Sequence, residues 1–110
     1  MQFLYLNSNK LGLGDDKLGE ELLISYLQAI VLNETKIDFV FCVNSGAFLT
    51  TTNQAAINLL KRLEENGATV VTCGTCLDYY NIKEQLEVGD VGSMALAIQV
   101  MQKAKTIYRP

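Results

Sequence analysis

The sequence contains no histidine, and this absence removes several kinds of active site at once. Without imidazole there is no Ser-His or Cys-His nucleophile pair, no histidine-ligated metal and no imidazole general base. Tryptophan is also absent, and the only proline is the last residue, Pro110. Thioredoxin-type oxidoreductases are expected to place a cis-proline opposite their cysteine pair, so the lack of an internal proline disfavours that class.

Positive charge is neither abundant nor clustered. Nine basic residues against twelve acidic ones give a net charge of −3, and the basic residues are scattered along the chain. Nucleic-acid binding needs a concentrated basic face, so it is not expected. No apolar run approaches the roughly 20 residues that span a bilayer, and the first residues lack the basic segment and cleavage site of a signal peptide. We therefore expect a cytoplasmic protein whose 110 residues form one domain, residues 1–110.

Apolar patterning alternates between strand-like and helix-like segments along the chain. Short apolar runs predict strands at residues 2–6, 37–43, 68–72, 87–91 and 105–108. Helical spacing predicts a helix capped by Asp15 or Asp16, one beginning near Thr51, a short one at Cys73 and one capped by Ser93. This order is typical of a mainly parallel sheet with helices on both faces.

Polar loops follow the predicted strands, and in a parallel sheet such loops meet at one edge. Ligands of these sheets bind beyond the carboxyl ends of the strands. The loops that emerge there carry Asn7-Ser8, Asn44-Ser45-Gly46, Cys73-Gly74-Thr75-Cys76 and Asp90-Val91-Gly92-Ser93. The cysteine pair is therefore expected at the functional edge of the fold.

The pair Cys73 and Cys76 is the strongest chemical signal. An odd cysteine count with one close pair is not a disulfide framework, and in a reducing compartment such a pair is more often catalytic or metal-binding. Cys73 is predicted at a helix N-terminus, where the amides of Gly74 and Thr75 and the helix dipole favour thiolate over thiol. Fewer free donors are expected around Cys76, one turn into the helix. The simpler alternative is that both cysteines fill a tight corner between strand and helix.

Neither a structural metal nor a dinucleotide cofactor is expected. Structural zinc needs four ligands, and the one remaining cysteine, Cys42, lies inside an apolar strand as a predicted core residue. The loop Gly12-Leu13-Gly14 can cradle a phosphate, but Lys17 stands where the dinucleotide fingerprint has its third glycine. Asp15 and Asp16 would repel phosphate, so a turn followed by a helix cap is the simpler interpretation.

Several segments in a defined order carry a resemblance to a known family. They are Asn7-Ser8, Gly12, Gly14-Asp15, Leu18-Gly19, Asn44-Ser45-Gly46, the run 73–78 and Val88-Gly89. Together they resemble the DsrE-like family (DsrE, DsrF, DsrH and YchN), and most of all the DsrE-like C-terminal domain of the selenium-metabolism protein YedF, which is sulfurtransferase-like. The similarity covers essentially the whole chain.

The resemblance implies a five-stranded, three-layer α/β/α fold and sulfur-relay chemistry, in which a cysteine holds a persulfide and passes its terminal sulfur to a partner thiol. It implies that Cys73, at the exit of the third strand, is the relay cysteine; Cys76 stands where such relatives often lack cysteine. YedF-type proteins also carry a TusA-like domain, so a TusA-like carrier is the implied partner, and this chain is either a stand-alone protein or one domain of a longer one. Trimers or hexamers are implied too, and the neighbouring aromatic residues Tyr79 and Tyr80 fit an interface.

Two functions remain open, and cysteine reactivity separates them. The first is a small sulfur carrier or sulfurtransferase-like protein, with Cys73 forming the persulfide and Cys76 assisting or resolving it. The second is a non-enzymatic ligand-binding or assembly module of the same fold. A site thiol with a pKa well below the ordinary value of about 8.5 favours the first. The expected substrate-binding residues are Asn7, Ser8, Gly14, Asp15, Asn44, Ser45, Gly46, Gly74 and Thr75.

Overall fold

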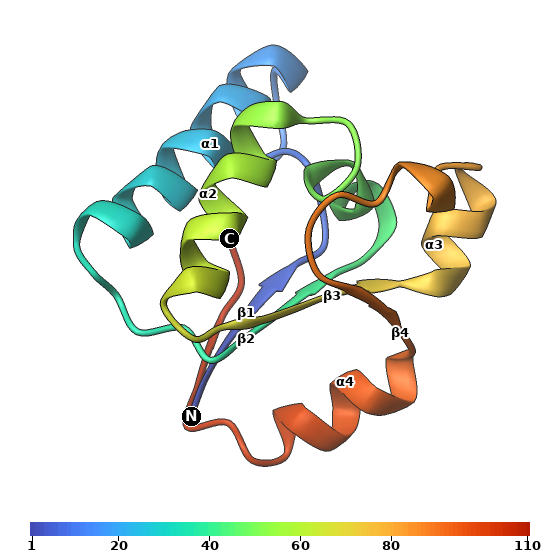
Figure 1. The fold of residues 1–110 in the computed structure, drawn as a ribbon. Helices are drawn as coiled ribbons and strands as arrows, with labels where there is room; N and C mark the ends of the chain where they lie inside the picture. The colour runs from blue at the N-terminus through green and yellow to red at the C-terminus, as the bar shows by residue number, and fades with distance from the viewer.

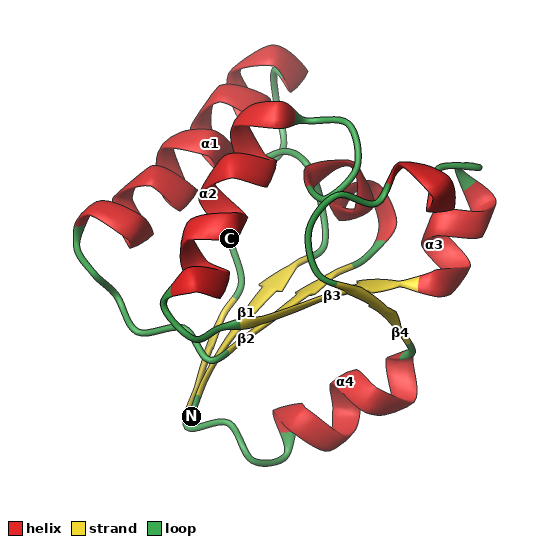
Figure 2. Cartoon of the chain, viewed as in Figure 1, coloured by secondary structure: helices red, strands yellow, loops and turns green.

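A five-stranded sheet lies between two unequal layers of helix (Figures 1 and 2). The computed structural model describes all residues from Met1 to Pro110. The strands are β1 (Gln2–Leu6), β2 (Phe39–Cys42), β3 (Thr69–Cys73), β4 (Asp90–Gly92) and β5 (Thr106–Tyr108). Their order is β4-β3-β2-β1-β5, and every neighbouring pair is parallel. The predicted α/β class with a parallel five-stranded sheet is confirmed.

Four α-helices and two short 3-10 helices connect the strands. They are α1 (Asp16–Leu32), η1 (Asn44–Leu49), α2 (Gln54–Glu65), α3 (Gly74–Tyr79), η2 (Lys83–Gln85) and α4 (Met94–Met101). The side chains of Asp15, Asn53 and Ser93 cap α1, α2 and α4, each accepting a hydrogen bond from the amide three residues further on. Each cap satisfies a donor that the first helical turn leaves without a partner.

The first face of the sheet carries most of the core. α1 and α2 lie side by side over this face (Figure 1), because the connections from β1 to β2 and from β2 to β3 move in the same direction and right-handed crossovers then fall on the same side. Leu4, Val40 and Val70 point from the strands into this layer, where they pack with Leu27 and Leu60 of the helices. All five side chains are almost completely buried.

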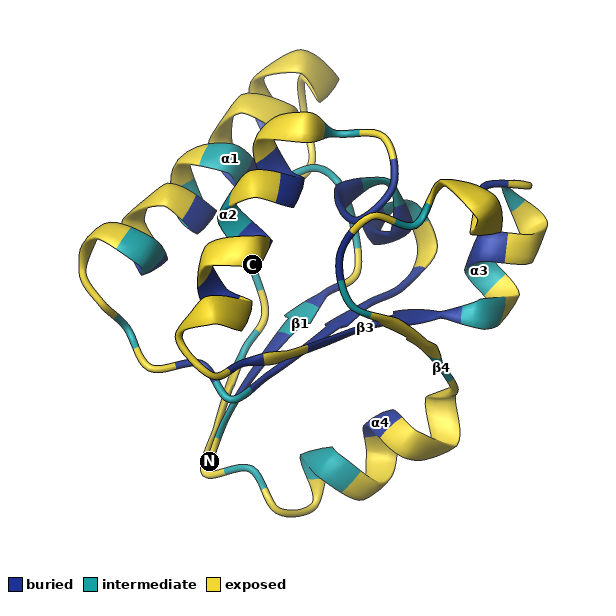
Figure 3. Ribbon diagram, viewed as in Figure 1, coloured by how far each residue is buried: buried dark blue, intermediate teal, exposed yellow.

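The second face is covered only by the eight-residue helix α4. From β4 the chain returns across the sheet to pair β5 with β1, so this crossover lies on the opposite face (Figure 1). Only Ala97 of α4 is buried, and Figure 3 shows the rest of the helix largely exposed; Ile98, for example, is 48% exposed. The buried aromatic side chains of this layer come from the strands: Phe3, Phe39 and Phe41.

Some element boundaries differ from the predictions. The second strand was expected over residues 37–43 but pairs only over Phe39–Cys42, and the fourth, expected over 87–91, is Asp90–Gly92. Thr51 does not begin α2, because its hydroxyl donates to the Ala47 carbonyl at 2.9 Å. A 3-10 helix intervenes after β2, and Asn53 takes the capping position instead, accepting the Ala56 amide at 3.1 Å.

Gly89 and Gly12 form a matched pair that tests how closely the loop before β4 packs on β3. Both have positive φ, +76° and +80°, but a Cβ at Gly89 would collide with the backbone of Val70, whereas one at Gly12 would meet nothing within 4 Å. We predict that Gly12→Ala lowers the free energy of unfolding by about 1–2 kcal/mol and Gly89→Ala by a further 1–3 kcal/mol or so. Urea denaturation measures both losses; equal losses would contradict the close packing.

Candidate functional site

Hydrogen bonds join the loops that follow β1, β2 and β3 at the carboxyl edge of the sheet. Between the first two loops, the Ser45 hydroxyl accepts the Asn9 amide at 3.1 Å and donates to the Ser8 hydroxyl at 3.4 Å. Between the second and third, the Asn44 amide donates to the Cys76 sulfur at 3.1 Å. The structure therefore brings residues from three separate parts of the chain to one edge.

The loop after β2 approaches β1 closely because position 46 is glycine. A Cβ on Gly46 would collide with the Leu6 carbonyl oxygen. Asn44, two residues earlier, has a φ of 53°, a left-handed conformation that asparagine adopts more readily than most residues. In this conformation its amide meets Cys76, and its side-chain oxygen accepts a hydrogen bond from the Tyr80 hydroxyl at 2.9 Å. Asn44 therefore ties the second loop to both ends of α3.

Cys76 lies at a surface hollow of about 400 Å³, which we call the cysteine depression. Its lining residues are Asn44, Thr75, Cys76, Tyr79 and Tyr80. Tyr79 is 83% exposed and stands edge-on to Tyr80, with ring centroids 5.3 Å apart. Tyr80 in turn packs against Phe48 at 4.5 Å. An open hollow with one aromatic wall suits contact with a partner molecule more than enclosure of a ligand.

The two cysteines of the pair lie in different surroundings. Cys73 is only 6% exposed and packs with Phe41 and Val71, because it is the last residue of β3 and its side chain alternates onto the α4 face. Cys76 is partly exposed and lines the depression. Although Cys73 is the N-cap of α3, its sulfur caps no helix amide. The predicted arrangement, with helix amides around Cys73 and few donors at Cys76, is therefore not the one found.

Burial raises the pKa of the Cys76 thiol. The Asn44 amide acts in the opposite direction, but the neighbouring Cys73 thiol raises the pKa further, through a hydrogen bond and through its charge. The depressed pKa expected of a relay thiol is thus not found at Cys76. A thiolate formed from a weakly acidic thiol is the stronger nucleophile once it has formed.

Cys42 is a core residue, as predicted. It is completely buried on the α1 and α2 face, and burial raises its pKa to about 12 despite a hydrogen bond with Thr72. Thr72 shares a buried hydrogen bond of 2.7 Å with Thr50, so the polar groups beneath the site are paired. Cys42 is separated from Cys73 by the sheet itself, since the two sulfurs belong to opposite faces.

The remaining predicted site residues are placed less centrally. Asp15 caps α1 by accepting the Leu18 amide at 2.8 Å, and Gly14 forms the turn before it with a φ of +135°. No hydrogen bond links these two residues to the loops after β2 and β3. Asn7 is exposed at the end of β1 and Gly74 opens α3. Gly14 and Asp15 thus have a role in starting α1.

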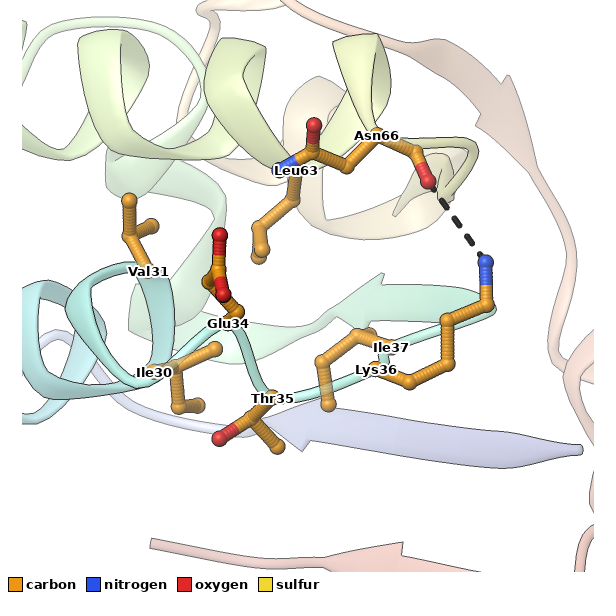
Figure 4. A pocket seen from close by; sticks show the side chains of 8 residues that line it. All are labelled: Ile30, Val31, Glu34, Thr35, Lys36, Ile37, Leu63 and Asn66. Atoms are coloured by element: carbon orange, nitrogen blue, oxygen red, sulfur yellow. Dashed lines mark hydrogen bonds between the residues drawn. The ribbon is translucent and has the colours of Figure 1, made fainter.

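A second hollow lies at the opposite, amino-terminal edge of the sheet (Figure 4). It measures about 150 Å³ and is lined by Ile30, Val31, Glu34, Thr35, Lys36, Ile37, Leu63 and Asn66. The Lys36 ammonium extends to the Asn66 backbone carbonyl at 3.5 Å and lies 3.7 Å from the Asp38 carboxylate. Its charge is therefore already partnered, and the hollow contains no thiol.

Two further properties concern metal binding and membrane insertion. No group of three or more cysteine, aspartate or glutamate side chains is gathered in a way that could hold a metal ion. None of the helices has the length and apolar character needed to cross a membrane.

Sequence reasoning missed the part played by Tyr80. Its hydroxyl holds Asn44, and Asn44 holds Cys76. A signal was present, because Tyr80 follows Cys76 by four residues and one helical turn places such residues on the same side. The left-handed conformation of Asn44 had a weaker signal in the turn-forming sequence Asn44-Ser45-Gly46.

We predict that iodoacetamide modifies the three cysteines in the order of their exposure. Cys76 should react first, Cys73 at a rate lower by roughly tenfold or more, and Cys42 only after unfolding. Because its pKa is raised, the rate at Cys76 should still increase above the ordinary thiol pKa of about 8.5. Timed quenching and peptide mass mapping measure both. Cys42→Ser is the control and should leave the rate at Cys76 unchanged. Earlier labelling of Cys73, or a rate that levels off below pH 8, would contradict this account of the site.

Comparison with known proteins places these features in a family. The model of the DsrE/DsrF-like family matches residues 13–108. Among solved structures, the chain is similar to the YchN protein from E. coli, with a TM-score of 0.73, 15% identity and coverage of 99% of this chain and 97% of that one. It is also similar to MTH1491, a protein of unknown function from Methanobacterium thermoautotrophicum, with a TM-score of 0.68, 16% identity and the same coverage. No curated protein matches significantly. Since the family model spans most of its length, the chain belongs to the DsrE/DsrF-like family.

Proposed function

We propose that the protein is a sulfur carrier that accepts a sulfane sulfur on its cysteine pair and passes it to a partner thiol. The observation that carries the proposal is the partly exposed Cys76 sulfur, which meets the Asn44 amide at an open depression and has a second thiol, Cys73, beside it. Membership of the DsrE/DsrF-like family, which is associated with sulfur relay, supports the same chemistry.

In this proposal Cys76, rather than Cys73, receives the sulfur. Transfer between two proteins requires that the donor and acceptor sulfurs meet, and Cys73 is only 6% exposed beneath the α4 layer. Cys76 faces the depression and needs no rearrangement to be reached. This assignment departs from the resemblance, which implies the cysteine at the exit of the third strand.

The transfer step conserves electrons. The Cys76 thiolate attacks the outer sulfur of a donor persulfide, a new S–S bond forms at Cys76, and the donor's own S–S bond breaks to leave the donor thiolate, which takes up the proton lost from Cys76. The Asn44 amide is 3.1 Å from the resting sulfur, where a hydrogen bond favours the charged form. Because the pKa of Cys76 is raised, we expect its thiolate to form when the donor binds rather than in the free protein.

The partner in this proposal is a protein with an exposed thiol of its own, as in a TusA-like carrier. The aromatic wall of the depression, with Tyr79 exposed at its rim, is suited to such a contact. The closer likeness to the YedF domain, selenium in place of sulfur, and a cytoplasmic location belong to the same proposal.

One observation favours the second candidate, a non-enzymatic ligand-binding or assembly module. Relay thiols are commonly acidic, whereas the pKa of Cys76 is raised. In this reading the cysteines complete the packing at the end of β3, and the depression serves only as a contact surface.

We predict that the reduced protein gains one sulfur per chain from cysteine persulfide, as measured by intact mass after desalting. Cys76→Ser should abolish the gain, because it removes the exposed sulfur. Cys73→Ser should retain it, and Cys42→Ser, a buried cysteine of the other face, is the matched control and should behave like the parent.

The other outcomes separate the candidates. Loading of Cys76→Ser but not of Cys73→Ser would reverse the assignment within the pair. If neither the parent nor Cys73→Ser gains sulfur, the carrier function is wrong and the binding module is favoured.

We also propose that the chain forms a homo-oligomer, a trimer or hexamer as the resemblance implies. Tyr80 is held by Asn44, so Tyr79 is the tyrosine that remains exposed. Further exposed apolar side chains lie on α4, where Met94, Leu96 and Ile98 are 49%, 37% and 48% exposed. A helix that is apolar on most sides is normally covered, and this supports contact with another copy.

We predict that Ile98→Lys lowers the solution mass towards that of a monomer, since a charge would be buried in the contact. Leu32→Lys is the control: Leu32 is 81% exposed on α1, over the other face, and its replacement should leave the mass unchanged. Multi-angle light scattering measures both. A parent protein that is monomeric over a wide concentration range would rule out the oligomer.

A further inference from the structure

Cys73 is a thiol that the proposed transfer from a partner does not use. Its side chain is 6% exposed, so a sulfur on another protein does not reach it. Cys76 nevertheless packs against the apolar cluster that contains Cys73, and the Cys73 thiol is near enough to raise the pKa of Cys76. A buried thiol in this position is placed to react with its neighbour rather than with a sulfur on another protein.

We propose that Cys73 discharges the Cys76 persulfide from within the protein, releasing its outer sulfur as hydrosulfide and leaving a Cys73–Cys76 disulfide. The inference rests on the proposed function, because it needs a persulfide on Cys76. It adds a second fate for the bound sulfur, which does not depend on an acceptor protein.

The step balances in atoms and electrons. The Cys73 thiolate attacks the inner sulfur of the persulfide, the Cys73–Cys76 bond forms, and the bond to the outer sulfur breaks with its electron pair. The outer sulfur leaves as hydrosulfide, reduced by two electrons, while the two cysteine sulfurs together lose two. The Cys73 proton passes to solvent. A dithiol reductant then returns the disulfide to two thiols, being oxidised to a disulfide itself.

The local fold favours this reaction. Cys73 is the N-cap of α3 and Cys76 is the third helical residue, a spacing of three that places two side chains on the same side of a helix start. The Asn44 amide holds the Cys76 sulfur at this end of the helix. Cys42 has no equivalent access, because it lies on the opposite face of the sheet.

The consequence is a carrier that holds its persulfide sulfur for a limited time. An acceptor thiol that docks on the depression competes with Cys73 for the persulfide, one attacking the outer sulfur and the other the inner. When no acceptor arrives, sulfide is released and the disulfide form can accept no further sulfur until a dithiol reduces it. The redox state of the pair therefore regulates entry of sulfur at the same site.

The test follows the loaded protein in the absence of any acceptor. The parent, Cys73→Ser and Cys42→Ser are loaded with cysteine persulfide, desalted and incubated without oxygen, with intact mass and released sulfide measured over time. The parent and Cys42→Ser should lose the added sulfur, release about one sulfide per chain and finish two hydrogens lighter than the reduced protein. Cys73→Ser should keep its persulfide roughly tenfold longer or more.

Peptide mapping of the discharged parent tests the product without any variant. Trypsin places Cys73 and Cys76 on one peptide, residues 63–83, and Cys42 on another, residues 37–61. The expected disulfide is internal to the first peptide. A bond between the two peptides, or between chains, would overturn the inference.

The outcomes distinguish this inference from the function on which it rests. If the parent and Cys73→Ser load equally and keep their sulfur equally long, the internal discharge is wrong and the carrier function stands. If neither the parent nor Cys73→Ser takes up sulfur, the carrier function is wrong and the discharge falls with it.

Discussion

The in-register parallel pairing of β1, β2 and β3 is the constraint on which the site depends. Leu6, Cys42 and Thr72 are aligned across the three strands, so the strands end together at one edge. The chain segments that follow are then close enough for hydrogen bonds between loops that are more than 30 residues apart in sequence. A shift of one residue in β3 would exchange its two faces and move Cys73 from the α4 layer to the α1 and α2 layer.

The alternation of side chains along β3 also makes the two thiols of the pair unequal. Thr72 faces the thick layer beneath α1 and α2, where it pairs with Thr50, and Cys73 faces the thin layer beneath α4. Cys76 is carried back to the surface by the first turn of α3. One thiol is thus placed to meet another molecule and the other is placed to meet only its neighbour, a division that suits a carrier with an internal route of release.

The thin layer beneath α4 and the raised pKa of Cys76 both fit the proposed dependence on a partner. The α4 face leaves apolar side chains exposed that a second copy would cover, and the hydrophobic contribution of such burial is roughly 25 cal/mol for each Å². Burial and the neighbouring Cys73 thiol raise the pKa of Cys76, so in the proposed transfer a docking partner that stabilises the thiolate would promote the reaction.

Local patterns in the sequence determined the α/β class, the five strands, three of the four α-helix starts and the core position of Cys42, because these depend on residues within a few positions of one another. The capping residue of α2 was misassigned to Thr51, because Asn53, two residues on, competes for the same role and a 3-10 helix comes first. The location of the cysteine pair at the carboxyl edge was also readable, since parallel topology dictates it. Only the tertiary structure decided which thiol is exposed, because that depends on the face to which β3 turns Cys73 and on the amide of Asn44, 32 residues before Cys76.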